Sequence, residues 1–314
     1  MTTPPPLLPA LAERATAAAH ARAPGCACGA TVTLADRPDA TVVRHAATVA
    51  KAHAPDTDPD ALAARLGAAA RLPGILLPPL RPAPVRLRGR HVTFWPYGTP
   101  VDPDDPDAAP WEAAATLLAR LHRSSLPGLR LPPMRGPVKA AHAVARLRAA
   151  AAHPGAVPVL RAWAGLPAWA RGEAPPPKTA VVCHGDLHLG QLVRHPAPDG
   201  PWLLIDVDDL GVGVPAWDLA RPAAWYACGV LPPEQWARFL AAYRSASGPA
   251  VPQDGDPWPA LDVPARALTV QTAARAVTKA AAEERPLDEV ERALVDACAR
   301  MAALPADPAA SGAT

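Results

Sequence analysis

The change in local pattern along this chain constrains its fold more than any other feature. Through roughly the first hundred positions, short segments rich in Val and Thr alternate with turn residues, which predicts strands. We expect them at 30–34, 41–45, 48–53, 85–87 and 91–95, with helices at 8–23 and from 58 to about 70. In the second helix Asp58 can cap the first turn, and Pro59 suits the position that follows.

After a link rich in Pro and Gly at 95–100, the pattern becomes helical. Helices are expected at 110–124, 138–152, 157–169, 216–228, 233–245, 264–284 and 287–303, interrupted by one strand–loop–strand unit at 179–207. This order predicts an α+β fold with two domains, at 1–97 and 98–304, followed by a disordered tail at 305–314.

Composition excludes several classes of protein. A length of 314 residues with 50% hydrophobic residues suffices for two domains and a sizeable core. The net charge of +2 carries no basic cluster, so nucleic-acid binding is not expected. No apolar run approaches about 20 residues, and residues 1–6 lack the basic start and apolar core of a signal peptide. We therefore expect no membrane span, and no protein partner is implied.

The cysteines favour a reduced protein without structural metal. Five cysteines is an odd number, which a cytoplasmic location explains most simply. Cys26-Ala27-Cys28 forms a single C-x-C with no matching pair of Cys or His in the sequence. We therefore predict no metal site there.

The residues most informative about chemistry lie at 182–191 and 204–206. Asp186 follows the turn-prone Gly185, Gln191 comes five residues later, and Asp206 ends the apolar run 202–205. Phosphoryl transfer needs groups in this order: a base for the acceptor hydroxyl, then two oxygen ligands for magnesium. The segment therefore predicts catalysis by Asp186 and magnesium binding by Gln191 and Asp206.

This segment resembles the catalytic loop of the aminoglycoside phosphotransferase and choline kinase-like family. The string His-Gly-Asp-Leu-His-Leu-Gly-Gln at 184–191 is similar to the loop of maltose kinases, which belong to the same superfamily. The run at 211–220 resembles the family's Gly-x-Pro-x-x-Asp-Leu-Ala pattern. The resemblance implies a bilobal protein kinase-like fold, with a five-stranded antiparallel sheet and a helix in the N-lobe and a mostly helical C-lobe. Its specificity is concentrated in residues 182–220.

The resemblance also implies supporting roles around the loop. His184 would pack under the loop and hydrogen-bond to backbone, and Asp218 would accept hydrogen bonds from the loop backbone. His188 could face the substrate or only solvate the loop. Either Asp208 or Asp209 could join the metal or face the acceptor, or both could be solvated loop acids. Gln191 stands where the family usually has Asn, which changes the magnesium geometry by one methylene.

In the N-lobe the resemblance implies a nucleotide site. Lys51 is the only lysine before position 139 and lies on the third predicted strand, where the family keeps the lysine that contacts the α- and β-phosphates. The hinge near 94–98 would present backbone groups to adenine, and Trp95 and Tyr97 could flank the ring. Core packing is an equally good interpretation of Trp95.

Two features depart from the family pattern. The turn at 35–40 contains no glycine, so backbone groups or Arg37 would have to contact the phosphates. No acidic residue occurs from 61 to 101, so the usual Glu partner of the strand lysine is missing from the helix interior. Only Asp58 or Asp60, at the start of that helix, could substitute.

The function that these residues favour is phosphorylation of a hydroxyl on a small molecule by ATP and Mg²⁺. The acceptor could be an aminoglycoside-like antibiotic, a sugar or an amino alcohol. One alternative is a pseudokinase, a nucleotide-binding module without turnover, which the two departures motivate. Another is a metal-dependent hydrolase built on His184, Asp186 and His188, whose side chains suit zinc.

Overall fold

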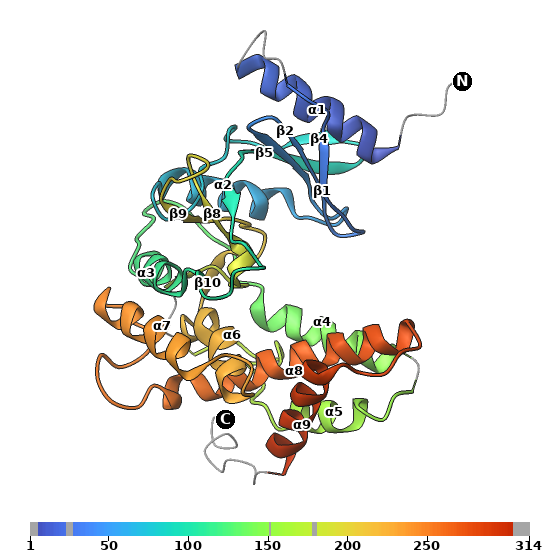
Figure 1. Ribbon diagram of the computed structural model, residues 1–314, viewed down its shortest axis with the longest axis vertical. Helices are drawn as coiled ribbons and strands as arrows, with labels where there is room; N and C mark the ends of the chain where they lie inside the picture. The colour runs from blue at the N-terminus through green and yellow to red at the C-terminus, as the bar shows by residue number, and fades with distance from the viewer. Residues whose placement is uncertain (1–5, 23–27, 151, 178–180, 304–314) are drawn as a thin grey trace. The chain divides into compact units, whose positions relative to one another are not determined.

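A computed structural model describes residues 6–22, 28–150, 152–177 and 181–303 (Figure 1). The expected disordered tail at 305–314 lies outside these residues, as does Cys26. The chain divides into two compact units. Unit 1 comprises Met1–Pro110, Ser125–Pro132 and Leu189–Asp208, and unit 2 comprises Trp111–Ser124, Pro133–His188 and Asp209–Thr314.

Unit 1 is built on a five-stranded antiparallel sheet. Its elements are α1 (Leu7–Arg22), β1 (Val32–Asp36), β2 (Thr41–His45), β3 (Thr48–Ala52), α2 (Pro59–Arg71), β4 (Val85–Leu87) and β5 (Arg90–Pro96). The strand order is β1-β2-β3-β5-β4. The predicted strands and helices of this region are confirmed, with β1 shifted by two residues toward the C-terminus.

Helix α1 covers one face of this sheet (Figure 1). Because side chains alternate across a strand, Ala50 and Ala52 of β3 point toward α1 while Lys51 lies on the opposite face. Leu11 and Ala15 of α1 pack against these small side chains and are fully buried. The alternation therefore separates an apolar face under α1 from a face that carries a charged residue.

The start of α2 follows the predicted capping. The side chain of Asp58 accepts hydrogen bonds from the backbone N–H of Asp60 at 2.9 Å and of Ala61 at 3.3 Å. Pro59 occupies the first turn, where its missing N–H has no partner to lose.

A small second sheet completes unit 1. It joins β6 (Thr99–Pro100), β8 (Leu192–Arg194) and β9 (Trp202–Leu204) in the order β6-β8-β9, and the short 3-10 helix η1 (Leu189–Gln191) precedes β8. Leu204 donates from its N–H to the carbonyl of Ile75 at 2.9 Å and accepts from Leu77 at 2.9 Å. The β8–β9 hairpin is thereby fixed to the segment that follows α2.

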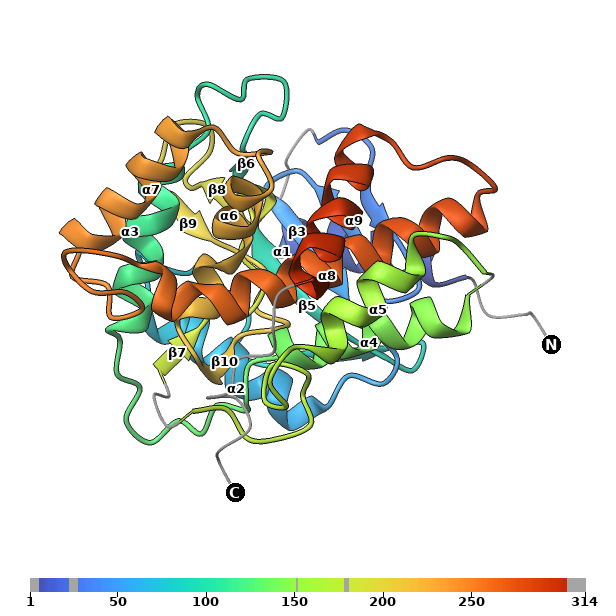
Figure 2. The same cartoon turned by 90° about the horizontal axis from the view of Figure 1, so that it is seen from below.

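Unit 2 is mostly helical. Its elements are α3 (Trp111–His122), α4 (Gly136–Ala149), α5 (Ala156–Ala164), β7 (Val181–Cys183), β10 (Gly211–Gly213), α6 (Ala216–Ala227), α7 (Pro233–Ser245), α8 (Trp258–Ala282) and α9 (Glu289–Ala302). Helix α8 packs against α4 and α6 (Figure 2), and β7 pairs with β10 in antiparallel register. Together the two units confirm the predicted α+β class.

Two helix ends in unit 2 differ from prediction. Helix α8 begins at Trp258, not near Pro264, because Pro259 already supplies a proline in the first turn and Pro264 is accommodated inside the helix. Helix α5 ends at Ala164, followed by Gly165, instead of continuing to 169. Within the described residues, no helix has both the length and the apolar surface that crossing a bilayer requires.

Candidate functional site

Four side chains of unit 1 form what we call the Lys51 cluster: Lys51, His53, Asp206 and Asp208. The Nζ of Lys51 lies 2.7 Å from Oδ1 of Asp206 and 3.0 Å from Oδ2 of Asp208. The Nδ1 of His53 lies 2.9 Å from Oδ1 of Asp208. Strand β3 thus supplies a cation to two carboxylates that follow β9.

The charges in this cluster stabilise one another. Burial alone would lower the pKa of Lys51, but Asp206 and Asp208 hold that pKa above its ordinary value. Burial alone would raise the pKa of Asp208, but Lys51 and His53 hold that pKa well below its ordinary value. Lys51 and Asp208 therefore stay ionised at neutral pH.

Gln191 and Asp206 are neighbours because of the β8–β9 hairpin. The backbone N–H of Ile205 donates to the carbonyl of Gln191 at 2.9 Å, directly before Asp206. Asp206 has a φ of +63°, in the left-handed region that only a minority of non-glycine residues adopt. Such a conformation is typical of functional sites, where the surrounding structure holds it in place.

These oxygen-bearing side chains fit magnesium. Mg²⁺ prefers hard oxygen ligands, and Asp206 and Asp208 bring two carboxylates together at Lys51. Gln191, whose backbone bonds to Ile205, carries an amide oxygen on its side chain. The Oδ1 atom of Asp208 is buried and lies 2.9 Å from Nδ1 of His53. A carboxylate oxygen has more than one lone pair, so Asp208 can also serve a cation beside this contact.

The partners of Lys51 differ from those expected. Asp58 uses its side chain to cap α2, and Asp208 joins Asp206 at Lys51. Asp208 is thus a second acidic partner of Lys51, which a linear sequence could not reveal because the two residues are so distant along the chain.

The hinge residues are largely engaged inside unit 1. Trp95 is buried and donates from Nε1 to Thr93 Oγ1 at 2.8 Å, which supports its interpretation as a packing residue. The N–H of Tyr97 donates to Ala47 at 2.8 Å, and its carbonyl lies 3.1 Å from Nδ1 of His195. The guanidinium of Arg44 lies 3.4 Å from the centre of the Tyr97 ring. Adenine contacts through the backbone of Tyr97 would have to displace these partners.

In unit 2, both carboxylate oxygens of Asp186 have a cationic partner. Lys139 of α4 lies 2.6 Å from Oδ2, and Arg221 of α6 lies 2.7 Å from Oδ1. Lys139 also lies 2.5 Å from Oδ2 of Asp209. One lysine therefore bridges two carboxylates, in a group that we call the Asp186 cluster.

This arrangement keeps Asp186 ionised. Burial alone would raise its pKa, but Lys139, Arg221 and, more weakly, His188 hold the pKa of Asp186 well below its ordinary value. A carboxylate with so low a pKa is a weak base, but its ionised oxygens remain good hydrogen-bond acceptors.

Lys139 should be the main stabiliser of the Asp186 cluster. A Lys139→Met variant is expected to lose about 2 to 4 kcal/mol of unfolding free energy near neutral pH, because two partly buried carboxylates then repel each other. In the native protein the depressed pKa of Asp186 gives stability that is complete at neutral pH and is lost only as pH falls through its folded-state pKa. In the variant the pKa of Asp186 rises because Lys139 is gone, so the deficit should shrink as the pH is lowered toward about 5.

Denaturant unfolding of both proteins at neutral and mildly acidic pH measures this. Lys279→Met is the matched control. Lys279 is exposed on α8, and its ion pair with Glu283 is long, at 3.9 Å. A deficit of Lys139→Met that equals the control, or that does not depend on pH, would contradict the assigned role.

The turn that carries Asp186 is held from beneath by Asp218. The backbone N–H of His184 donates to Oδ2 of Asp218 at 2.6 Å, and that of Gly185 donates to Oδ1 at 2.7 Å. His122 Nε2 lies 3.0 Å from Oδ2 of Asp218, and His122 Nδ1 lies 2.7 Å from the hydroxyl of Tyr243. Burial and the hydrogen bonds of this chain of side chains fix the carboxylate of Asp218.

Gly185 is required in this turn. Its φ is +86°, and a Cβ at this position would collide with the backbone carbonyl of Asp209. Only glycine therefore lets the loop pass close to the residue that shares Lys139 with Asp186.

The zinc hydrolase interpretation finds no support in the arrangement of these side chains. Within the described residues, two groups bring His, Cys or carboxylate atoms close enough to hold a metal, namely His20 with Cys28 and His45, and His122 with Cys183 and Asp218. Neither contains Asp186 or His188. The three residues 184, 186 and 188 are therefore not gathered as metal ligands in this part of the chain.

Further cations surround the Asp186 cluster. The Nε of Arg135 lies 3.8 Å from Oδ1 of Asp209. Arg275 of α8 is within electrostatic range of Asp186, Asp209 and Arg221. Positive charge therefore dominates the surroundings of Asp186.

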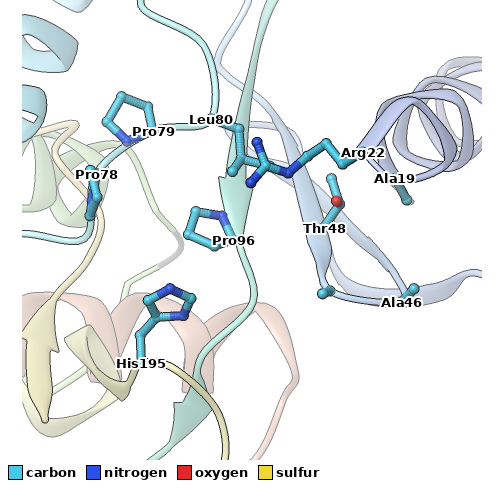
Figure 3. A pocket seen from close by; sticks show the side chains of 10 residues that line it. Ala19, Arg22, Ala46, Thr48, Pro78, Pro79, Leu80, Pro96 and His195 are labelled. Carbon is cyan, nitrogen blue, oxygen red and sulfur yellow. The ribbon is translucent and has the colours of Figure 1, made fainter. Parts of the chain in front are cut away.

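A pocket of about 580 Å³ lies in unit 1 away from the Lys51 cluster (Figure 3). Its lining includes Arg22, Thr48, Pro79, Pro96 and His195. No member of the Lys51 cluster lines it, so we assign it no part in the chemistry.

Several residues of the two clusters were missed by reasoning from sequence. They are His53, Lys139 and Arg221, together with His122 and Tyr243, which support the turn from beneath. The scarcity of lysine was the one available signal for Lys139, since the chain holds only four. The others lie on helices or, in the case of His53, just after β3, and all are outside any motif.

Comparisons with known proteins agree with this architecture. A family model described as the phosphotransferase enzyme family matches residues 34–258. A choline/ethanolamine kinase family protein from Mesorhizobium loti is 19% identical, with 94% of this chain and 96% of that chain covered and a TM-score of 0.55. No curated protein sequence matches.

Two antibiotic phosphotransferases share the fold at lower identity. Spectinomycin phosphotransferase, solved with ADP and spectinomycin, is 12% identical over 88% of this chain and 93% of that chain, with a TM-score of 0.57. A thermostable mutant of an aminoglycoside phosphotransferase, solved with AMP-PNP and hygromycin B, is 12% identical over 89% of this chain and 96% of that chain, with a TM-score of 0.57. At such identities the structures show a common protein kinase-like fold.

Proposed function

Because the chain belongs to the phosphotransferase enzyme family, we propose that it transfers the γ-phosphoryl group of ATP to a hydroxyl group of a small molecule. The observation that carries this proposal is Asp186, which stands on a turn held by Asp218 and is kept ionised by Lys139 and Arg221. A lobe with only a structural role would not require an ionised carboxylate on a turn that is held in this way.

We assign ATP to the residues of unit 1. Lys51 would exchange its carboxylate partners for phosphate oxygens, which are equally good acceptors for an ammonium group. Asp206, Asp208 and Gln191 would hold Mg²⁺, which neutralises charge on the phosphates when it is bound. His53 would keep Asp208 oriented, since its Nδ1 lies 2.9 Å from that carboxylate.

We assign the acceptor hydroxyl to Asp186 in unit 2. The carboxylate would accept a hydrogen bond from the hydroxyl and take up its proton as the bond to phosphorus forms. A strong base is unnecessary because the transition state of phosphoryl transfer is loose. Lys139 and Arg221, already within 2.7 Å of the carboxylate oxygens, would hold Asp186 in one orientation during this step.

The charges around Asp186 bear on the class of acceptor. Lys139, Arg221 and Arg135 contact the two carboxylates directly, and Arg275 lies within electrostatic range of both. A polycationic aminoglycoside would be repelled by these side chains, whereas an acceptor with a carboxylate or phosphate group would be attracted. The proposal therefore favours a neutral or anionic hydroxyl compound, such as a sugar or a sugar acid.

The test is a competition among acceptors of different charge. The protein, ATP and Mg²⁺ are incubated with a pool of aminoglycosides, neutral sugars, amino alcohols and hydroxy acids, and the products are identified by mass spectrometry. Phosphorylation of a neutral or anionic acceptor by the native protein, but not by Asp186→Asn, is expected. Phosphorylation of aminoglycosides alone would overturn the acceptor class but leave the reaction type standing.

The pseudokinase remains a second candidate because of specific contacts. Lys51 is already bound to both carboxylates proposed as magnesium ligands, and both oxygens of Asp186 are occupied. A nucleotide-binding module without turnover would bind ATP in a magnesium-dependent way, yet phosphorylate no member of the pool.

A further inference from the structure

A second group of ligand-type side chains lies in unit 1, away from the Lys51 cluster. His20 stands near the C-terminal end of α1, Cys28 precedes β1, and His45 ends β2. The Nε2 atoms of both histidines lie 2.9 Å from Sγ of Cys28. We propose that this triad binds a zinc ion, which cross-links α1 to the sheet.

The hydrogen bonds behind His45 fix the tautomer that a metal needs. The hydroxyl of Thr16 donates its hydrogen to the carbonyl of Ala12 at 3.0 Å. In its 3.4 Å contact with the hydroxyl of Thr31, the oxygen of Thr16 must therefore be the acceptor. Thr31 has then used its own hydrogen, and its 3.0 Å contact with Nδ1 of His45 requires an N–H on that nitrogen. A neutral His45 therefore directs the lone pair of Nε2 at Cys28. An outer partner on the second ring nitrogen is typical of zinc-binding histidines.

The geometry admits the ion after a small adjustment. The three candidate ligand atoms lie within 4.8 Å of one another. Tetrahedral zinc with usual bond lengths places its sulfur and nitrogen ligands about 3.5 Å apart. The sulfur of Cys28 and each histidine nitrogen must therefore move apart by roughly half an ångström. His20 is exposed at the end of a helix and is free to make that movement. Its exposure also leaves a coordination position to solvent.

The proposed zinc site is separate from the proposed nucleotide site. His45 lies on the face of the sheet that packs against α1, whereas Lys51 lies on the other face. The ligand types differ as well, since thiolate and imidazole select zinc and carboxylates select magnesium. We therefore expect zinc to stabilise unit 1 without entering the chemistry. Ala19 and Ala46, the sequence neighbours of His20 and His45, line the pocket of Figure 3.

The sequence alone predicted no metal site at Cys28, and the proposal departs from that prediction because it rests on side chains that the fold brings together. The sequence shows no paired spacing because His20 lies 8 residues before Cys28 and His45 lies 17 residues after it. Only the packing of α1 against β2 brings the two histidines to one sulfur.

The experiment uses full-length protein without an affinity tag, reduced and stripped of metal by a chelator. Binding of Zn²⁺ is measured in competition with a chromophoric chelator, and Co²⁺ is titrated to read thiolate coordination from its charge-transfer absorption. The native protein should bind about one equivalent and gain several degrees of thermal stability with Zn²⁺. Cys28→Ser should abolish the cobalt charge-transfer band, and His20→Ala should weaken zinc binding by at least roughly tenfold.

Cys228→Ser and His142→Ala are the matched controls. Cys228 is half-buried like Cys28 but lies at the end of α6, and His142 is exposed on α4. Both should bind zinc as the native protein does. The proposal is overturned if the native protein takes up less than about a tenth of an equivalent, or if Cys28→Ser keeps the cobalt spectrum. The triad is then a hydrogen-bonded cluster only, and the proposed phosphotransferase activity is untouched.

Discussion

An Asp186→Asn variant is expected to lower kcat for phosphoryl transfer by roughly 10²- to 10⁴-fold, the usual contribution of a general base. Asn has nearly the size of Asp and can still accept one hydrogen bond, but it cannot take the proton of the acceptor hydroxyl. It also removes the charge that pairs with Lys139 and Arg221. Because ATP is assigned to unit 1, the KM for ATP should change by less than about threefold.

The measurement is steady-state kinetics with the acceptor that the pooled assay identifies. Asp296→Asn is the matched control, since Asp296 is an exposed acid on α9 in the same unit. The control should keep native kcat. If Asp186→Asn retained more than about a tenth of native kcat, Asp186 would not be the base.

An Asp206→Ala variant is expected to lower kcat/KM for ATP by about a hundredfold or more. Loss of an outer partner of a metal ligand already costs about 10- to 100-fold, and Asp206 is proposed as a direct ligand. The variant also leaves Lys51 with Asp208 as its one remaining acidic partner among the described residues. The concentration of Mg²⁺ needed for half-maximal rate should therefore rise together with the KM for ATP.

A magnesium titration at fixed ATP separates weakened magnesium binding from a general loss of activity. Asp199→Asn serves as control, because Asp199 is an exposed acid on the loop between β8 and β9. It should leave the magnesium dependence unchanged. An Asp206→Ala protein with reduced rate but native magnesium dependence would argue that Asp206 only orients Lys51.

Much of the fold follows from local pattern. The strands β2 to β5 and the helices α2, α3, α6 and α7 lie close to their predicted positions, because apolar spacing and caps such as Asp58 act within a few residues. Helix α8 was mispredicted at its start because two prolines offered competing signals, and local sequence cannot choose between Pro259 and Pro264.

The residues that pair with Asp186 and Lys51 could not be predicted from local sequence pattern. Asp186 stands in a recognisable turn, but Lys139 and Arg221 lie 47 and 35 residues away on helices without a motif. Lys51 and Asp206 are 155 residues apart. Such pairs depend on how helices and sheets pack, and packing is a property of the whole chain.

The most direct test of the account is the fate of the γ-phosphoryl group. ATP with a radiolabelled γ-phosphoryl group is incubated with the protein, Mg²⁺ and the identified acceptor, and the label is followed by chromatography for native protein and Asp186→Asn. The account predicts that label moves from ATP into the acceptor with the native protein and remains in ATP with the variant. Label that stays in ATP with the native protein, or that appears only as inorganic phosphate, would contradict it.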